Sequence, residues 1–132
     1  MQLSTFEIHH LARNHPEELV RVVRDEPLTP PVLAYALEEM GAGNSGVATV
    51  ALLWKSLLDP IAEVRRGAIR GLAALYGRTH DPAALVCVDK LRELGLTDPS
   101  KAVRDEATAA LVALSPPTAD NGGAAEEATV SA

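Results

Sequence analysis

One residue pattern occurs twice in this chain of 132 residues, at a separation of 39 positions. The first copy begins at Asp59 and reads DPIAEVRRGAIRGLAAL, and the second begins at Asp98 and reads DPSKAVRDEATAALVAL. A period of roughly 20 to 50 residues is typical of chains built from stacked helical units, because each unit buries its apolar face on the next. The repetition therefore predicts a stack of helices.

The composition also favours helices. The chain is 47% hydrophobic but only 3% aromatic, so its core must consist of Leu, Val, Ile and Ala. Sheets are enriched in β-branched and aromatic residues, whereas Leu and Ala are strong helix formers. No segment shows a strand pattern.

Helix boundaries follow from capping and breaking residues. Ser4 and Glu7 form a possible capping box. Asp-Pro pairs at positions 59, 81 and 98 should cap and open helices, and Gly41, Gly77 and Gly95 should close them. The seven expected helices cover residues 5–13, 16–26, 30–40, 46–58, 60–76, 82–94 and 99–115, with Asn44 or Ser45 capping the fourth.

These helices predict an all-α fold in the form of a short right-handed α-solenoid. Helices two and three, four and five, and six and seven should pair as three antiparallel hairpins, with helix one closing the N-terminal end. This domain is expected to span residues 1–115. Residues 116–132 are small, polar and acidic without a bulky apolar stripe, so we expect a disordered tail there.

The repeated segment resembles the HEAT-repeat family. In that family the second helix of each hairpin carries an Asp-Pro start, a Val-Arg pair and an Ala-x-x-x-Leu spine, which match the segments starting at Asp59 and Asp98. The resemblance covers residues 44–114, about half of the chain, and weakens over residues 16–41, where Pro30-Pro31 replaces the Val-Arg region. It implies stacked hairpins whose second helices line a concave face.

The resemblance further implies that one set of residues ties neighbouring repeats together structurally. This set is Asp59, Pro60, Arg65, Asp98, Pro99 and Arg104. Helical spacing agrees, because Val64 and Val103 fall on the buried stripe and place the adjacent arginines at its edge. Gly67 and Gly71 lower helix propensity, and close approach of another helix is the best reason for them.

The outward residues of the two Asp-Pro-led helices are the candidate binding surface. They are Glu63, Arg66, Arg70, Lys101, Asp105 and Thr108. Mixed charge with interleaved arginine suits a protein or peptide partner, because arginine pairs well with carboxylates. An ordinary solvated helix face accounts for the same pattern, and both interpretations stay open.

Other reactive residues give weak signals. Two residues of a helical metal site are spaced three or four apart, whereas His9, His10 and His15 have gaps of one, five and six, so no metal site is predicted. Cys87 lies beside an apolar stripe and is expected to be a buried, inert thiol. Trp54 falls at a spacing typical of core or inter-helix packing, with an interface role as the alternative.

The sequence therefore predicts a non-catalytic protein–protein interaction module, an adaptor or accessory subunit without a cofactor. One alternative is an enzyme or enzyme accessory, since some HEAT-like proteins are bilin lyases or di-iron hydroxylases, although this chain has no His-Glu dipeptide. Another is a nucleic-acid binder acting through the arginines between Arg65 and Arg78, as in HEAT-like DNA glycosylases. The net charge of −6 disfavours it.

The remaining expectations concern surroundings and assembly. Three hairpins are close to the smallest stable stack, so a monomer or an end-to-end homodimer is expected. A single cysteine permits no internal disulfide, which suits the cytoplasm. The N-terminus lacks the features of a signal peptide, and the longest near-apolar run, residues 46–54, is too short to span a membrane.

Overall fold

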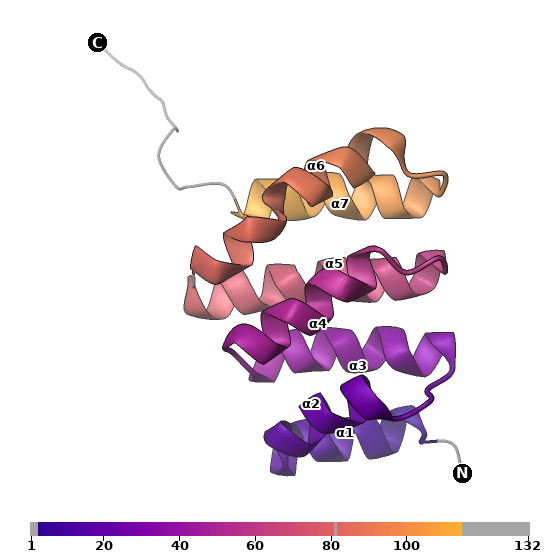
Figure 1. The fold of residues 1–132 in the computed structure, drawn as a ribbon, viewed down its shortest axis with the longest axis vertical. Coiled ribbons are helices and arrows are strands. Elements are labelled where there is room, and N and C mark those ends of the chain that lie inside the picture. Colours follow the sequence, from indigo (N-terminus) through magenta and orange to yellow (C-terminus); the bar gives the residue numbers. More distant parts are fainter. Residues whose placement is uncertain (1–2, 81, 115–132) are drawn as a thin grey trace.

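The computed structural model describes residues 3–80 and 82–114, and this part of the chain contains helices and no strand (Figure 1). Within these residues the prediction of an all-α fold with seven α-helices is confirmed. The expected tail, the domain boundary after residue 115 and the capping role of Asp81 fall outside the described residues. The elements are α1 (Thr5–Asn14), α2 (Pro16–Asp25), α3 (Pro30–Gly43), α4 (Val47–Leu57), α5 (Ala62–Thr79), the 3₁₀ helix η1 (Pro82–Cys87), α6 (Val88–Thr97) and α7 (Lys101–Leu114).

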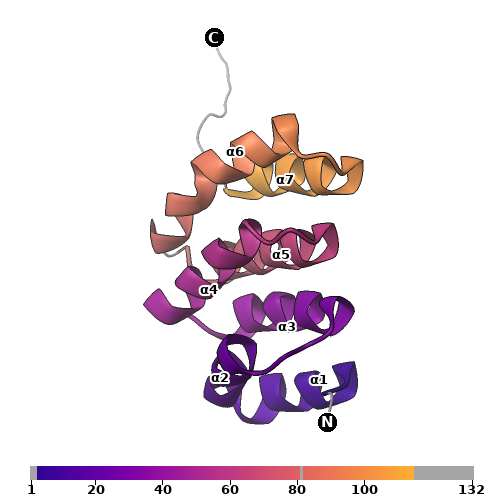
Figure 2. The same cartoon turned by 45° about the vertical axis from the view of Figure 1, so that its right-hand side comes forward.

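The helices form two layers, which Figure 2 shows side by side. The first layer holds α1, α3, α5 and α7, and each of these helices packs on the next one in that order. The second layer holds α2, α4, η1 and α6, and α2, α4 and α6 each pack on the first-layer helix that follows in the chain. The loops before α3, α5 and α7 lie one above another at one edge of the molecule (Figure 1).

Helix α5 is the centre of this arrangement, because it contacts α3, α4, η1 and α7. Its side chains Val64, Ala68, Leu72 and Leu75 are buried and belong to the hydrophobic core. Burial of a Val or Leu side chain contributes about 1.5–3 kcal/mol, so this stripe is a major part of the core. Among the described residues, no helix combines the length and the apolar content needed to cross a bilayer.

Glycines bring α3 and α5 into backbone contact. A methyl group at Gly67 would overlap the backbone of Ala34, and one at Gly41 would overlap the backbone of Gly71. At Gly71 it would lie 2.6 Å from the carbonyl oxygen of Leu37, closer than real Cβ atoms come. The expectation that Gly67 and Gly71 allow close approach of a neighbouring helix is therefore confirmed.

Two substitutions in α5 separate helix propensity from helix contact. Gly77 is exposed and has open space around it. Gly77→Ala should therefore raise the free energy of unfolding by up to about 1 kcal/mol. Gly67→Ala raises helix propensity equally but forces α3 and α5 apart. We therefore expect it to lower the free energy of unfolding by about 1–3 kcal/mol. Urea unfolding followed by circular dichroism measures both, and equal effects of the two substitutions would contradict the close contact.

The two Asp-Pro segments form turns ahead of their helices. The side chain of Asp59 accepts a hydrogen bond from the Ile61 N–H at 2.9 Å, and Asp98 accepts one from the Ser100 N–H at the same distance. Because each aspartate bonds two residues ahead, the helices begin only at Ala62 and Lys101. The expectation that Asp59 and Asp98 cap these helices, with Pro60 and Pro99 as first helical residues, is therefore wrong. The Ser100 hydroxyl, which accepts from the Val103 N–H, caps α7 instead.

Arg65 links α5 to the loop before α7. Its Nε and Nη2 atoms each donate to one carboxylate oxygen of Asp98 at 2.8 Å, and its Nη1 donates to the Asp59 carbonyl at 2.9 Å. The side chains of Arg65 and Asp98 are 12% and 2% exposed. Burial alone would raise the pKa of Asp98, but hydrogen bonds from Arg65 and Ser100 and the nearby positive charges hold that pKa below its ordinary value.

Removing the Asp98 charge should destabilise the fold. Asp98→Asn leaves the buried Arg65 guanidinium without a counter-charge, and breaking such a pair from one side costs about 3–5 kcal/mol. Asp59→Asn is the matched control, because Asn can keep the turn to Ile61, and we expect it to cost less than about 1 kcal/mol. Chemical denaturation of the two variants beside the natural chain gives both values, and similar losses would refute a special role for Asp98.

The same carboxylate predicts an acid dependence of stability. The folded pKa of Asp98 is lower than its unfolded value. The contribution of this pair is therefore fully present above about pH 4 and is lost as pH falls through the lowered pKa. Unfolding free energies measured between pH 5 and pH 2 should fall more steeply for the natural chain than for Asp98→Asn. Parallel curves would contradict this assignment.

Several helix ends differ from expectation. Gly41, Gly77 and Gly95 do not close their helices, because α3, α5 and α6 continue to Gly43, Thr79 and Thr97. Gly41 is in backbone contact with α5, and Gly95 of α6 lies against the Thr108 side chain, so packing explains both glycines. His80 adopts the left-handed backbone conformation after α5 and takes the terminating role expected of Gly77.

The starts of two second-layer helices, α6 and α4, also differ from the sequence prediction. The sixth helix was expected over residues 82–94, but its first turns form η1 and the α-helical part starts only at Val88. Neither Asn44 nor Ser45 caps α4. Gly46 occupies that position with a positive φ, a backbone conformation that side-chain-bearing residues rarely adopt.

Candidate functional site

Two arginines of α5 converge on one glutamate of α7. Arg66 Nε lies 2.9 Å and Arg70 Nη2 lies 2.6 Å from the same carboxylate oxygen of Glu106. All three side chains are partly exposed. Two positive charges share one negative charge, so the cluster keeps an unmatched positive charge at the surface.

A shallow groove of small side chains adjoins this cluster. It has a volume of about 160 Å³ and runs between α5 and α7. Ala73 of α5 and Ala109 and Ala113 of α7 line it beside Arg70 and Glu106. Short side chains let a partner backbone approach the helices while its polar groups reach the charged end. We call the set of Arg66, Arg70, Ala73, Glu106, Ala109 and Ala113 the α5–α7 groove.

The remaining residues of the expected surface lie outside the groove. Glu63 is exposed in the first turn of α5. Lys101 and Asp105 form an exposed ion pair along α7, with 2.8 Å between Nζ and Oδ2. Thr108 donates to the Arg104 carbonyl and lies against Gly95 of α6. Of the six residues expected on this surface, Arg66 and Arg70 therefore share one site.

Sequence reasoning missed Glu106 and the alanines. Glu106 lies 39 positions after Gly67, and Gly67 is the residue by which α5 contacts the backbone of α3. A charged residue at such a position was the available signal. The alanines gave no such signal, because alanine occurs equally in cores, on helix surfaces and in grooves.

The arginines between positions 65 and 78 do not form one basic surface. Arg65 is held by Asp98. Arg78 donates to the carbonyl oxygens of Gly41 and Asn44 at the end of α3. The cluster that motivated a nucleic-acid interpretation thus divides into two arginines with structural contacts and the pair on Glu106.

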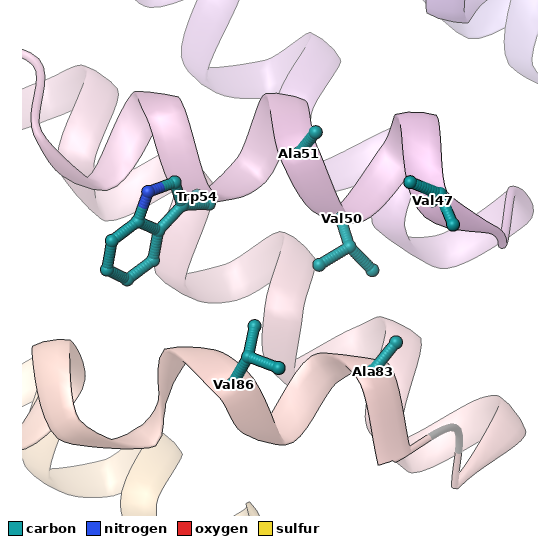
Figure 3. Close-up of a pocket in the computed structure, with 6 residues that line it drawn as sticks. All are labelled: Val47, Val50, Ala51, Trp54, Ala83 and Val86. Carbon is teal, nitrogen blue, oxygen red and sulfur yellow. The ribbon is translucent and has the colours of Figure 1, made fainter.

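An apolar hollow of about 380 Å³ lies in the second layer, between α4 and η1. Val50 and Val86 lie in the gap between the two helices, with Trp54 and Val47 further along α4 (Figure 3). Trp54 is 39% exposed and lines this hollow, so its indole lies outside the buried core. Inter-helix packing and an interface role both stay predictions for this residue. All six lining residues are apolar, and the hollow offers hydrophobic contact without polar side chains to orient a ligand.

The histidines and the cysteine that were considered as reactive residues make contacts that stabilise the fold or are buried. His9 lies near Tyr35 and Glu39 of α3, and His10 bonds Asn14 within α1. Within residues 3–80 and 82–114, no group of three or more His, Cys, Asp or Glu side chains is arranged to hold a metal ion. Cys87 is fully buried, and burial raises the pKa of its thiol to about 11.

Cys87 should therefore react only when the chain opens. With its pKa raised to about 11, the thiol is almost entirely protonated at pH 8, and burial also blocks access by a reagent. We expect no reaction with a disulfide reagent over minutes in buffer and one thiol per chain in strong denaturant. Because the chain has a single cysteine, the signal is unambiguous. Rapid reaction in buffer would instead identify an accessible, activated thiol.

No protein-family model, no curated protein and no solved structure matches this chain. The resemblance to HEAT repeats therefore stays a prediction from the residues.

Proposed function

We propose that this chain is a non-catalytic protein-binding module, a short right-handed HEAT-like solenoid that holds an acidic segment of another protein in the α5–α7 groove. One observation carries the proposal: the Arg66 and Arg70 side chains converge on Glu106 and leave positive charge beside a floor of alanines. A partner carboxylate can join this cluster through the guanidinium N–H groups that Glu106 does not use.

The dimensions favour a protein segment over a small substrate. Pockets for small molecules typically measure at least about 300 Å³. The groove is smaller, with a volume of about 160 Å³. It suits one or two side chains of a longer chain lying across α5 and α7. The residues that line the groove include no nucleophile with an adjacent base and no group of metal ligands, so the groove does not support the lyase or hydroxylase alternative.

The charge pattern favours protein over nucleic acid. Binding to a phosphate backbone usually engages several cations along one surface. Here only Arg66 and Arg70 of the arginines between positions 65 and 78 share a surface, and Glu106 offsets one of them. A single acidic side chain matches this arrangement better than a run of phosphates does.

Charge reversal in the groove should abolish partner binding. We expect a protein retained from extract by the immobilised natural chain to be lost with Arg66→Glu plus Arg70→Glu, and to bind more than about tenfold more weakly once purified. Arg24→Glu plus Arg92→Glu is the matched control, because it changes the net charge equally on α2 and α6, where both arginines are exposed.

Two further variants locate the contact. Ala109→Gln fills the groove without removing a charge, so it should weaken binding while circular dichroism shows an intact fold. Trp54→Ser alters the apolar hollow in the second layer and should leave binding unchanged. Loss of binding with Trp54→Ser, together with full binding by the arginine variant, would move the interface to that hollow and refute the groove.

A further inference from the structure

The outer side of α7 repeats the positions that α5 presents to α7. In α5 these positions are Arg65, Ile69 and Ala73, where Arg65 holds Asp98 and the other two line the groove against α7. Their counterparts 39 positions later are Arg104, Thr108 and Val112, which we call the α7 end face. Ile69 is 1% exposed, whereas its counterpart Thr108 is exposed. Val112, the counterpart of the partly buried Ala73, is 74% exposed, since no described first-layer helix follows α7.

Arg104 repeats one of the three hydrogen bonds of Arg65. Its Nη1 donates to the Asp98 carbonyl at 2.6 Å, just as Arg65 Nη1 donates to the Asp59 carbonyl. Arg65 also uses Nε and Nη2 to hold the Asp98 carboxylate. Within residues 3–80 and 82–114, the corresponding Nε–Nη2 edge of Arg104 has no acceptor. That edge is a two-pronged donor already oriented by the bond at Nη1.

We propose that the α7 end face docks a helical hairpin of a partner protein whose second helix is led by an aspartate. The partner aspartate would meet Arg104 as Asp98 meets Arg65, and an apolar side chain of its helix would cover Val112. Two features carry this inference: the α7 end face repeats the positions of the contact between α5 and α7, and the Nε–Nη2 edge of Arg104 has no acceptor among the described residues. Val112 adds exposed apolar surface, which marks interaction sites when it is contiguous with a specific polar contact.

A second copy of this chain fits the face poorly. Its own aspartate of this kind, Asp98, is already held by Arg65, and Asp59 lies inside the stack before α5. The outermost helix at its other end, α1, begins with the capping box of Ser4 and Glu7 rather than with an aspartate-led turn. These contacts disfavour a second copy as the occupant, and the inferred hairpin uses a surface different from the α5–α7 groove.

An extended chain tests whether the face accepts such a hairpin. Residues 76–114 span one period of 39 positions, and a second copy of them inserted after Leu114 would place an aspartate-led hairpin over α7. Hydrogen exchange of the original α7 amides reports the docking. We expect protection to rise about tenfold or more in the extended chain, and Arg104→Gln to remove most of that gain.

The natural chain supplies the controls. There Arg104→Gln should change α7 protection by less than about threefold, since it removes only the bond to the Asp98 carbonyl. In the extended chain, Asp98→Asn made only in the inserted copy should lower α7 protection by as much as Arg104→Gln does. The two substitutions combined should lower that protection no further. The absence of a gain on extension, or equal losses from Arg104→Gln in both chains, would overturn the proposal.

The acidic segment after α7 offers a competing occupant. Asp120→Asn with Glu126→Gln and Glu127→Gln, made in the natural chain, removes its three carboxylates. We expect unchanged protection of α7. If these substitutions lower the protection, then residues 115–132 of this chain cover the face, and the partner hairpin is wrong.

Discussion

The backbone contact between α3 and α5 sets the geometry on which the rest of the molecule depends. Gly41, Gly67 and Gly71 leave no room for a side chain between the two helices, so their relative position is fixed by main-chain atoms rather than by adaptable side chains. Interiors packed this closely transmit a shift instead of absorbing it. Helix α5 then has a defined position from which Arg65, Arg66 and Arg70 reach toward α7.

The Arg65–Asp98 pair transfers that defined position to the last hairpin. Both groups are nearly excluded from water, and such a pair is tolerated when its hydrogen bonds are satisfied. Asp98 accepts from Arg65 and from the Ser100 N–H, so its carboxylate both anchors α5 and shapes the turn before α7. Asp59 makes the equivalent turn, but α3 begins with Pro30-Pro31 and supplies no matching arginine. The same short motif therefore stabilises the fold very differently at its two positions.

The sequence predicts the parts of this structure that depend on periodicity. Apolar spacing and the recurrence at 39 positions predict seven helices, the central place of α5 and the packing role of Gly67 and Gly71. Helix ends were less predictable, because Gly41 and Gly95 look like terminators but serve tertiary contacts, which no local pattern reveals. The groove was half predictable. Arg66 and Arg70 project outward by spacing alone, whereas Glu106 and the alanines become a site only when α7 packs beside α5.

Comparison of two equivalent positions explains why a groove exists where it does. Gly67 lets α5 touch the backbone of α3, while Glu106, 39 positions later, places a charged side chain on the α5-facing side of α7. A side chain of that length separates two helices that would otherwise meet as α3 and α5 do. The space that remains is lined by alanines too short to fill it, and the carboxylate that creates it needs the arginines opposite. Replacing a contact residue by a charged one at a fixed position of the stack thus produces both the groove and its electrostatic character.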